Sequence, residues 1–196
     1  MTYLEAINFL LSKVGTREVA SEDVQHPDVV SAKSTLNQHV SQFLDRGWWF
    51  NHRKSVTHEP DSSGYINLGT NVLRIESSDE TRRDFPNLAL HGNRIYNVLD
   101  NTYTFEQSIT IDEYIDVAWD NIPHTAQVYI RYKAAAEYVE NKLEDVPKAN
   151  RLEMQAREAW GDLNADEVRS TRPNMLDSPS ARRMRAGVRP YNLRIN

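Results

Sequence analysis

One stretch of six residues constrains this chain more than any other: Arg46-Gly47-Trp48-Trp49-Phe50-Asn51. It closes a long amphipathic segment, and Gly47 lies where a helix ends in a left-handed conformation that a side chain would disfavour. If the three aromatic residues continue as a strand, Trp48 and Phe50 face one side and Trp49 the other. Each aromatic side chain brings about 150–250 Å² of surface that needs burial. The stretch therefore predicts a junction between a helix and a sheet, held by core packing. Ligand stacking is the alternative, but no polar partners lie nearby in the sequence.

Length and composition exclude several classes of protein. The chain has 196 residues, enough for one domain, or for a core domain with a small insert, that folds without a metal or a disulfide. It has no cysteine, which excludes disulfide scaffolds, zinc–cysteine sites and thiol catalysis. The first residues lack a basic segment and are interrupted by Glu5 and Asn8, so we expect no signal peptide. No apolar run approaches the roughly 20 residues of a membrane span, so we expect no membrane insertion.

Charge is distributed unevenly along the chain. Residues 169–196 contain seven arginines and one acidic residue, a net charge of +6. Since the whole chain has a net charge of −5, the other 168 residues carry −11. Such an asymmetry predicts a basic tail that binds an acidic partner or phosphate groups.

Periodicity predicts four helices. Thr2 and Glu5 have the spacing of a capping box, and residues 3–14 follow with apolar side chains at helical intervals. Pro27 can begin a second helix that runs to Arg46, and Pro123 and Pro147 can begin the third and fourth. The third helix is apolar over more than one face, which is typical of burial on two sides. A neighbouring subunit is one candidate for the second side.

Between the second and third helices the pattern changes to short β-branched and aromatic segments, separated by turn residues. The segments are 65–68, 72–75, 94–98 and 108–111. The predicted fold is α+β: a four-helix bundle with a small antiparallel β-sheet inserted between helices 2 and 3, plus an extended C-terminal arm. The predicted units are a helical bundle (1–47 and 121–169), a β-rich insert (48–120) and the arm (170–196).

The arm combines proline-containing breaks with scattered apolar residues. Arg172-Pro173, Ser178-Pro179 and Arg189-Pro190 prevent a long helix. Apolar side chains are interleaved with the arginines at Met175, Leu176, Met184, Val188, Tyr191, Leu193 and Ile195. This pattern favours docking onto an acidic neighbour. Phosphate contacts with nucleic acid and a solvated terminus are the alternatives.

We find no motif that indicates catalysis or a cofactor. The chain has no Gly-rich phosphate loop, no nucleophile elbow and no His-Glu-x-x-His. His52 and His58 would lie roughly 20 Å apart on one strand, so they cannot share a metal ion. The other four histidines stand alone in the sequence, and we predict no metal site.

Acidic residues gather in two places: Asp112, Glu113, Asp116 and Asp120 before the third helix, and Glu137, Glu140, Glu144 and Asp145 on it. Paired carboxylates can hydrolyse glycosides, but only at defined separations. Acids near a helix N-terminus also complement the helix dipole. We therefore expect a solvated or channel-facing role for them.

Several elements together carry a resemblance to a known family. They are the Arg46–Asn51 stretch at the junction, Pro123 with Tyr129-Ile130 in the third helix, and Asn174-Met175-Leu176-Asp177 after the last helix. This arrangement, over nearly the whole chain, resembles the tail tubular protein A family, the head-to-tail adaptors of short-tailed bacteriophages. The Arg-rich end after Asp177 departs from the family pattern.

The resemblance implies a structural protein of the virion tail, without enzymatic activity or a cofactor. It implies a homo-oligomeric ring, typically of twelve copies, beneath the portal protein and above a tail nozzle of the tail tubular protein B type. Viral DNA would pass through the lumen during ejection, and assembly would take place in the host cytoplasm. The predicted contacts with the portal or a neighbouring subunit are Arg172, Met175, Leu176, Arg182, Arg183, Arg185, Arg189 and Tyr191. The predicted structural junction is Gly47, Trp48, Trp49 and Phe50.

Two hypotheses from other classes remain open at this point. The first is a DNA-binding module that acts through the arginines of the arm. The second is a hydrolase of envelope glycans, for which the only motivation is the carboxylates at Asp112, Glu113 and Asp116.

Overall fold

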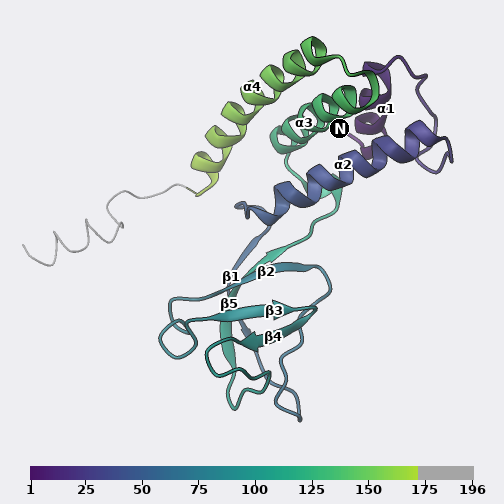
Figure 1. Ribbon diagram of the computed structural model, residues 1–196. Helices are drawn as coiled ribbons and strands as arrows, with labels where there is room; N and C mark the ends of the chain where they lie inside the picture. Colours follow the sequence, from purple (N-terminus) through teal and green to yellow (C-terminus); the bar gives the residue numbers. More distant parts are fainter. Residues whose placement is uncertain (172–196) are drawn as a thin grey trace, which may run out of the picture.

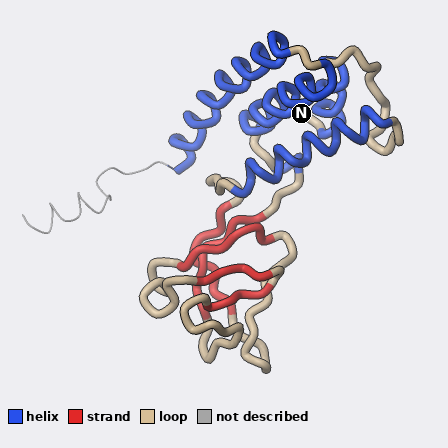
Figure 2. The backbone as a smooth tube through the Cα atoms, in the orientation of Figure 1, coloured by secondary structure: helices blue, strands red, loops and turns tan. Residues whose placement is uncertain are grey.

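The chain begins with two helices, passes through a β-rich region and returns to two longer helices (Figure 1). This is a computed structural model, and it describes residues 1–171. The β-rich region lies at one end of the helical bundle, and the chain crosses between the two after α2 and before α3 (Figure 2). The predicted α+β class, with four helices and antiparallel strands between the second and the third, is confirmed.

Local signals in the sequence set the ends of the helices. α1 (Tyr3–Lys13) begins with the predicted capping box: Glu5 N donates to Thr2 Oγ1 at 3.1 Å, and Thr2 N donates to Glu5 Oε2 at 2.7 Å. α2 (Pro27–Asp45) has proline in its first turn, where a missing N–H costs nothing. α3 (His124–Leu143) follows a short 3-10 helix, η1 (Trp119–Asn121). α4 (Val146–Thr171) has the predicted Pro147 in its first turn.

α3 is the central helix of the bundle, because α1, α2 and α4 all contact it. Its buried side chains face several directions: Ala126, Gln127, Ile130, Ala134, Ala135, Ala136, Tyr138 and Val139. The prediction that α3 is buried on more than one side is confirmed. α1, α2 and α4 of the same chain supply this burial, and a contact of α3 with a neighbouring subunit stays a prediction. None of the helices formed by residues 1–171 is both long and apolar enough to cross a membrane.

Two antiparallel sheets make up the β-rich region. β1 (His52–His58) and β2 (Val72–Ser77) flank β5 (Ile109–Ile115), and β3 (Leu88–His91) pairs with β4 (Arg94–Asn97). β3 was not predicted. The predicted strand 65–68 is wrong, because Tyr65 and Asn67 make only isolated bridges there.

Each region has its own cluster of buried residues. The larger core joins all four helices and includes Trp48 and Trp119, although both fall within the predicted 48–120 insert. The smaller core is formed by Ile66, Leu68, Ile75, Ile95, Phe105, Ile109 and Ile111. The division into units at residues 47 and 121 stays a prediction.

Candidate functional site

α2 ends at Asp45, two residues before Gly47, the first residue of the junction. Arg46 is still helical, with φ of −63°, and Gly47 turns to φ of +80° while its N–H donates to the Leu44 carbonyl at 3.1 Å. A Cβ atom at this position would overlap the ring of Tyr114 on β5 and lie 3.0 Å from Arg74 Nη2. Glycine is therefore required here twice, for its backbone conformation and for the close approach of the sheet.

The three aromatic residues that follow form a turn rather than a strand, so their predicted alternation between two faces is wrong. All three pack against the core of the bundle. Trp48 is 5% exposed, stacks on Phe43 with ring centroids 4.6 Å apart, and donates from Nε1 to the Phe43 carbonyl at 2.8 Å. Its ring also meets Trp160 of α4 edge-on at 5.4 Å. Trp48 therefore joins the end of α2 to α4.

Asn51 ties this turn to both regions, a role that the sequence analysis missed. Its Oδ1 accepts from Trp48 N at 2.8 Å, and its Nδ2 donates to the carbonyls of Leu44 at 2.9 Å and Ile115 at 3.0 Å. The residue is 1% exposed, so each bond replaces one that water would have made. The only signal for this role was a polar residue that directly follows three aromatic ones.

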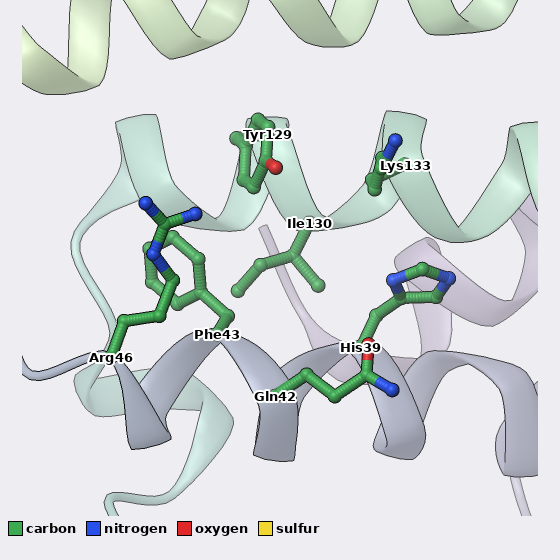
Figure 3. Close-up of a pocket in the computed structure, with 7 residues that line it drawn as sticks. All are labelled: His39, Gln42, Phe43, Arg46, Tyr129, Ile130 and Lys133. Carbon is green, nitrogen blue, oxygen red and sulfur yellow. The ribbon is translucent and has the colours of Figure 1, made fainter.

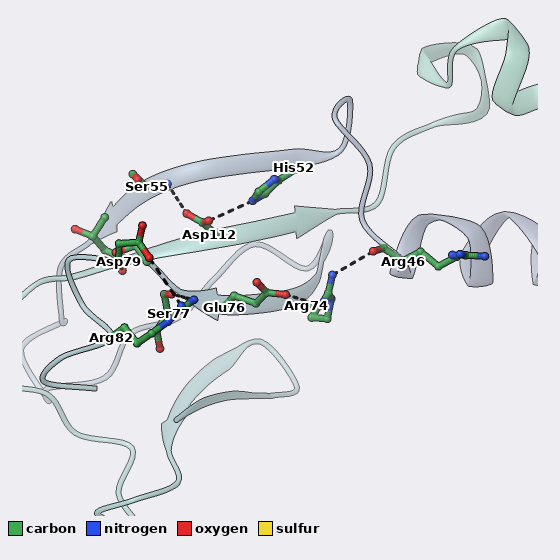
Figure 4. A network of polar contacts seen from close by, with 11 residues as sticks. Arg46, His52, Ser55, Arg74, Glu76, Ser77, Asp79, Arg82 and Asp112 are labelled. Carbon is green, nitrogen blue, oxygen red and sulfur yellow. Dashed lines mark hydrogen bonds and ion pairs between the residues drawn. The ribbon is translucent and has the colours of Figure 1, made fainter. Parts of the chain in front are cut away.

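Arg74 of β2 forms a second link between helix and sheet (Figure 4). Its guanidinium lies 4.0 Å from the centre of the Tyr114 ring and donates to Glu76 Oε1 at 2.6 Å and to the Arg46 carbonyl at 3.4 Å. On the same ring, His52 stacks at 4.5 Å. Burial raises the pKa of Tyr114, with the charge of Glu76 acting in the same direction. The phenol is therefore a neutral packing surface between two cationic or polar groups.

The carboxylates before α3 do not form one cluster. Asp112 accepts from Ser55 N at 2.8 Å and lies 3.4 Å from His52 Nε2 (Figure 4). Glu113 is 2% exposed and meets His58 Nε2 at 2.8 Å. The expected solvated role is therefore wrong for Glu113, because the strand register buries it against its partner on β1.

Asp116 and Asp120 are exposed, as expected of solvated residues. The first turn of α3 contains no acidic residue, so the expected complement to its helix dipole is also wrong. Asp112 and Glu113, which motivated the hydrolase hypothesis, are thus engaged in contacts between strands.

A groove with two adjacent cavities runs along α3. The first, of about 260 Å³, is lined from α2 and α3 by His39, Gln42, Phe43, Arg46, Tyr129, Ile130 and Lys133 (Figure 3). The second, of about 300 Å³, shares His39 and Lys133 and adds Ala136, Glu137, Glu140, Ala149, Asn150 and Glu153, the last three from α4. We call these residues together the three-helix groove. It is basic at the Arg46 end and acidic at the Glu140 end.

Polar and charged side chains connect the three helices across this groove. His39 Nε2 lies 2.9 Å from Glu137 Oε2, and Lys133 Nζ donates to Glu153 at 2.7 Å. Burial lowers the pKa of His39, and Glu137 opposes this shift. We take burial as the stronger effect, since the His39 side chain is 10% exposed while that of Glu137 is 39% exposed and solvated.

Four of the histidines have an acidic side chain nearby in the fold. They are His26, His39, His52 and His58. Within residues 1–171, no three histidine, aspartate or glutamate side chains gather in a way that could hold a metal ion. The predicted interaction residues of the arm, Arg172, Met175, Leu176, Arg182, Arg183, Arg185, Arg189 and Tyr191, lie outside the described residues.

Comparison with known proteins adds one finding. The family model described as Tube, tail tubular protein, matches residues 4–181, which include both helical pairs, the junction and the β-rich region. No curated protein matches the sequence.

Proposed function

This chain belongs to the tail tubular protein family, and we propose that it forms a ring that joins the portal to the tail nozzle. The family gives it a structural role in the phage tail. The finer proposal is a head-to-tail adaptor, typically of twelve copies, that binds the portal protein on one side and a nozzle protein of the tail tubular protein B type on the other. Viral DNA would pass through its lumen during ejection, and assembly would take place in the host cytoplasm.

The observation that carries this proposal is the family match over residues 4–181, and the charge distribution supports it. Residues 1–168 carry a net charge of −11. A lumen lined by such a surface repels phosphate, so DNA slides through it without binding. A closed ring also needs two different surfaces on each copy. We propose that the arm, through residues such as Arg182 and Tyr191, supplies one of them.

Native mass spectrometry of the purified protein, alone and with a portal ring, tests the proposal. We expect the full chain to bind the portal ring in many copies with one discrete stoichiometry. Deletion of residues 171–196 should leave the helices folded, because the last buried residue of α4 is Leu163, but should weaken assembly onto the portal. An unchanged stoichiometry of the deleted chain contradicts the role of the arm. Absence of any complex of many copies contradicts the ring.

A variant with Arg182, Arg183 and Arg185 changed to alanine provides a matched control, because it keeps the length of the arm and removes only charge. The same variant separates the adaptor from the second candidate, a DNA-binding module, which the arginine-rich composition of residues 169–196 favours. That candidate requires affinity for duplex DNA that falls steeply with salt and is lost in the variant. Weak binding that never saturates, even at low salt, rules it out.

A further inference from the structure

The three-helix groove has a floor of buried apolar side chains and carries an excess of negative charge at one end. Phe43 and Ile130 contribute apolar atoms at the Arg46 end, and Ala136 and Ala149 contribute them at the acidic end. Three carboxylates line the acidic end: Glu137, Glu140 and Glu153. Such a surface suits an occupant that presents apolar and basic side chains in alternation.

Among the three carboxylates, Glu140 is the one best placed to bind a partner. Glu153 already accepts two bonds from Lys133, and Glu137 contacts His39. Glu140 is exposed, on the last turns of α3. Among residues 1–171, Lys133 is the only lysine or arginine that lines this cavity, so the acidic end keeps an excess of negative charge.

The chain itself contains a segment of the complementary chemistry. Residues 172–196 have six arginines and one acidic residue, a net charge of +5, with apolar residues such as Met184 and Tyr191 between them. At about 3.3 Å per residue, these 25 residues span up to about 80 Å when extended. The groove from Tyr129 to Glu140 covers only about 16 Å of helix, at about 1.5 Å per residue.

The form of α4 indicates which copy receives the arm. Leu163 is its last buried residue, and none of residues 164–171 is buried; Val168 is 59% exposed. The helix therefore extends about 12 Å beyond its own core before the arm begins. The acidic end of the groove lies at the opposite end of α4, at Ala149 and Asn150. The arm therefore begins about 33 Å of helix from the acidic end of its own groove, at about 1.5 Å per residue, which favours the groove of another copy.

We propose that the arm of one copy, residues 172–196, docks into the acidic end of the three-helix groove of the neighbouring copy. The proposal rests on the ring proposed above and identifies one of its contacts. The contact is heterologous: each copy donates an arm to one neighbour and receives an arm from the other. Arginines pair with Glu140 and its neighbours, while the apolar residues of the arm lie along the groove between them.

Disulfide trapping tests the docking cleanly, because the chain has no cysteine. One chain carries Asn150→Cys in the groove, and a second carries a single cysteine in the arm, at Ala181, Ala186, Gly187 or Asn192 in turn. After mixing and mild oxidation, we expect a covalent dimer for at least one arm position, since a disulfide requires Cα atoms within about 7 Å. Its yield should exceed several-fold that of the control Thr70→Cys, an exposed site in the β-rich region.

Charge reversal at the groove supplies a second test with a matched control. Glu140→Arg should lower the dimer yield at least five-fold, while Glu158→Arg, an equal change on the exposed face of α4 outside the groove, should leave it unchanged. Changing Arg182, Arg183 and Arg185 to glutamate should restore the dimer with Glu140→Arg. Equal yields for Glu140→Arg and the control Glu158→Arg overturn the proposal.

The remaining outcomes separate the docking from the ring. A chain with both cysteines that forms only an internal cross-link, or yields no higher than the Thr70→Cys control, overturns docking between copies. If rings of many copies still assemble on the portal in that case, the adaptor function stands and only this contact is wrong. Covalent dimers without any ring on the portal support the docking and contradict the adaptor function.

Discussion

The helical bundle and the β-rich region hold together by different means. The core of the bundle contains 22 buried residues, nearly all aliphatic or aromatic, whereas the core of the β-rich region contains seven. Buried polar residues show the opposite distribution: Ser77, Ser78, Thr81, Asn97 and Glu113 belong to the β-rich region, and Gln127 alone to the four helices. The bundle is thus stabilised mainly by apolar burial, and the β-rich region depends more on specific hydrogen bonds.

This difference gives each region a different tolerance to change. Removing one apolar side chain from the large core costs transfer and cavity energy but leaves many contacts in place. Removing one polar partner from the small core leaves a buried group without a hydrogen bond. The Ser78 hydroxyl, for example, donates to the Thr110 carbonyl at 2.8 Å, and Ser77 donates to the Phe85 carbonyl at 2.6 Å. The junction combines both means in Trp48 and Asn51.

Trp48→Ala should produce the largest effect, because Trp48 completes the bundle core where it meets the sheet. Loss of a buried tryptophan costs about 3–5 kcal/mol of unfolding free energy. Urea unfolding followed by far-UV circular dichroism measures it. Trp49→Ala provides the control: Trp49 is only half-buried, so its removal should cost less. A thermal midpoint within a degree or two of the parent protein would show that Trp48 lies outside the core.

Asn51→Ala should produce the next largest effect and should weaken the link between the two regions. It leaves the Trp48 N–H and the carbonyls of Leu44 and Ile115 without their side-chain partner. We expect a loss of about 1–3 kcal/mol, the usual cost of a buried polar group left unpaired. Amide hydrogen exchange should show faster exchange in β5 and at the end of α2 than in the middle of α3.

Asn93→Ala is the matched control for this variant, because Asn93 is exposed in the turn between β3 and β4. It should leave exchange in β5 unchanged. Equal protection of β5 in both variants would mean that Asn51 does not couple the regions.

The sequence predicted the helices well because their signals are local. The Thr2–Glu5 capping box, Pro27 and Gly47 each act within one helical turn, and each lies at the helix end it marked. The α+β class followed from the same signals. The strands were harder to predict, since β propensity depends on neighbours that are distant in sequence. At residues 48–50, the bonds of Asn51 and packing on Phe43 override the strand preference of three aromatic residues.

The candidate site was less predictable for the same reason. Glu113 was expected to be solvated, and its burial depends on the pairing of β1 with β5, which brings His58 to it across 55 residues of sequence. Likewise, Arg74 meets Tyr114 and Arg46 only once the sheet has formed. No local pattern reveals such pairs. Composition, by contrast, revealed the charged arm directly, and its partners stay a prediction.

The smallest expected effect is a pH dependence of the unfolding free energy. It depends on His39, which lies in the bundle and not in the β-rich region. Burial holds its pKa in the folded protein below the ordinary value of 6.5, with Lys133 acting in the same direction and Glu137 and Glu153 against it. Below pH 6.5 the unfolded chain therefore binds a proton more readily than the folded one. The burial of neutral His39 therefore contributes fully to the unfolding free energy above pH 6.5. This contribution is lost as the pH falls below that value.

We expect the unfolding free energy to fall more between pH 7.5 and pH 5.5 in the parent protein than in His39→Gln, which stays neutral throughout. Urea titrations at both pH values measure the difference. His124→Gln, at an exposed site, should behave like the parent. If the parent protein instead gained stability over His39→Gln at low pH, the ion pair with Glu137 would outweigh burial.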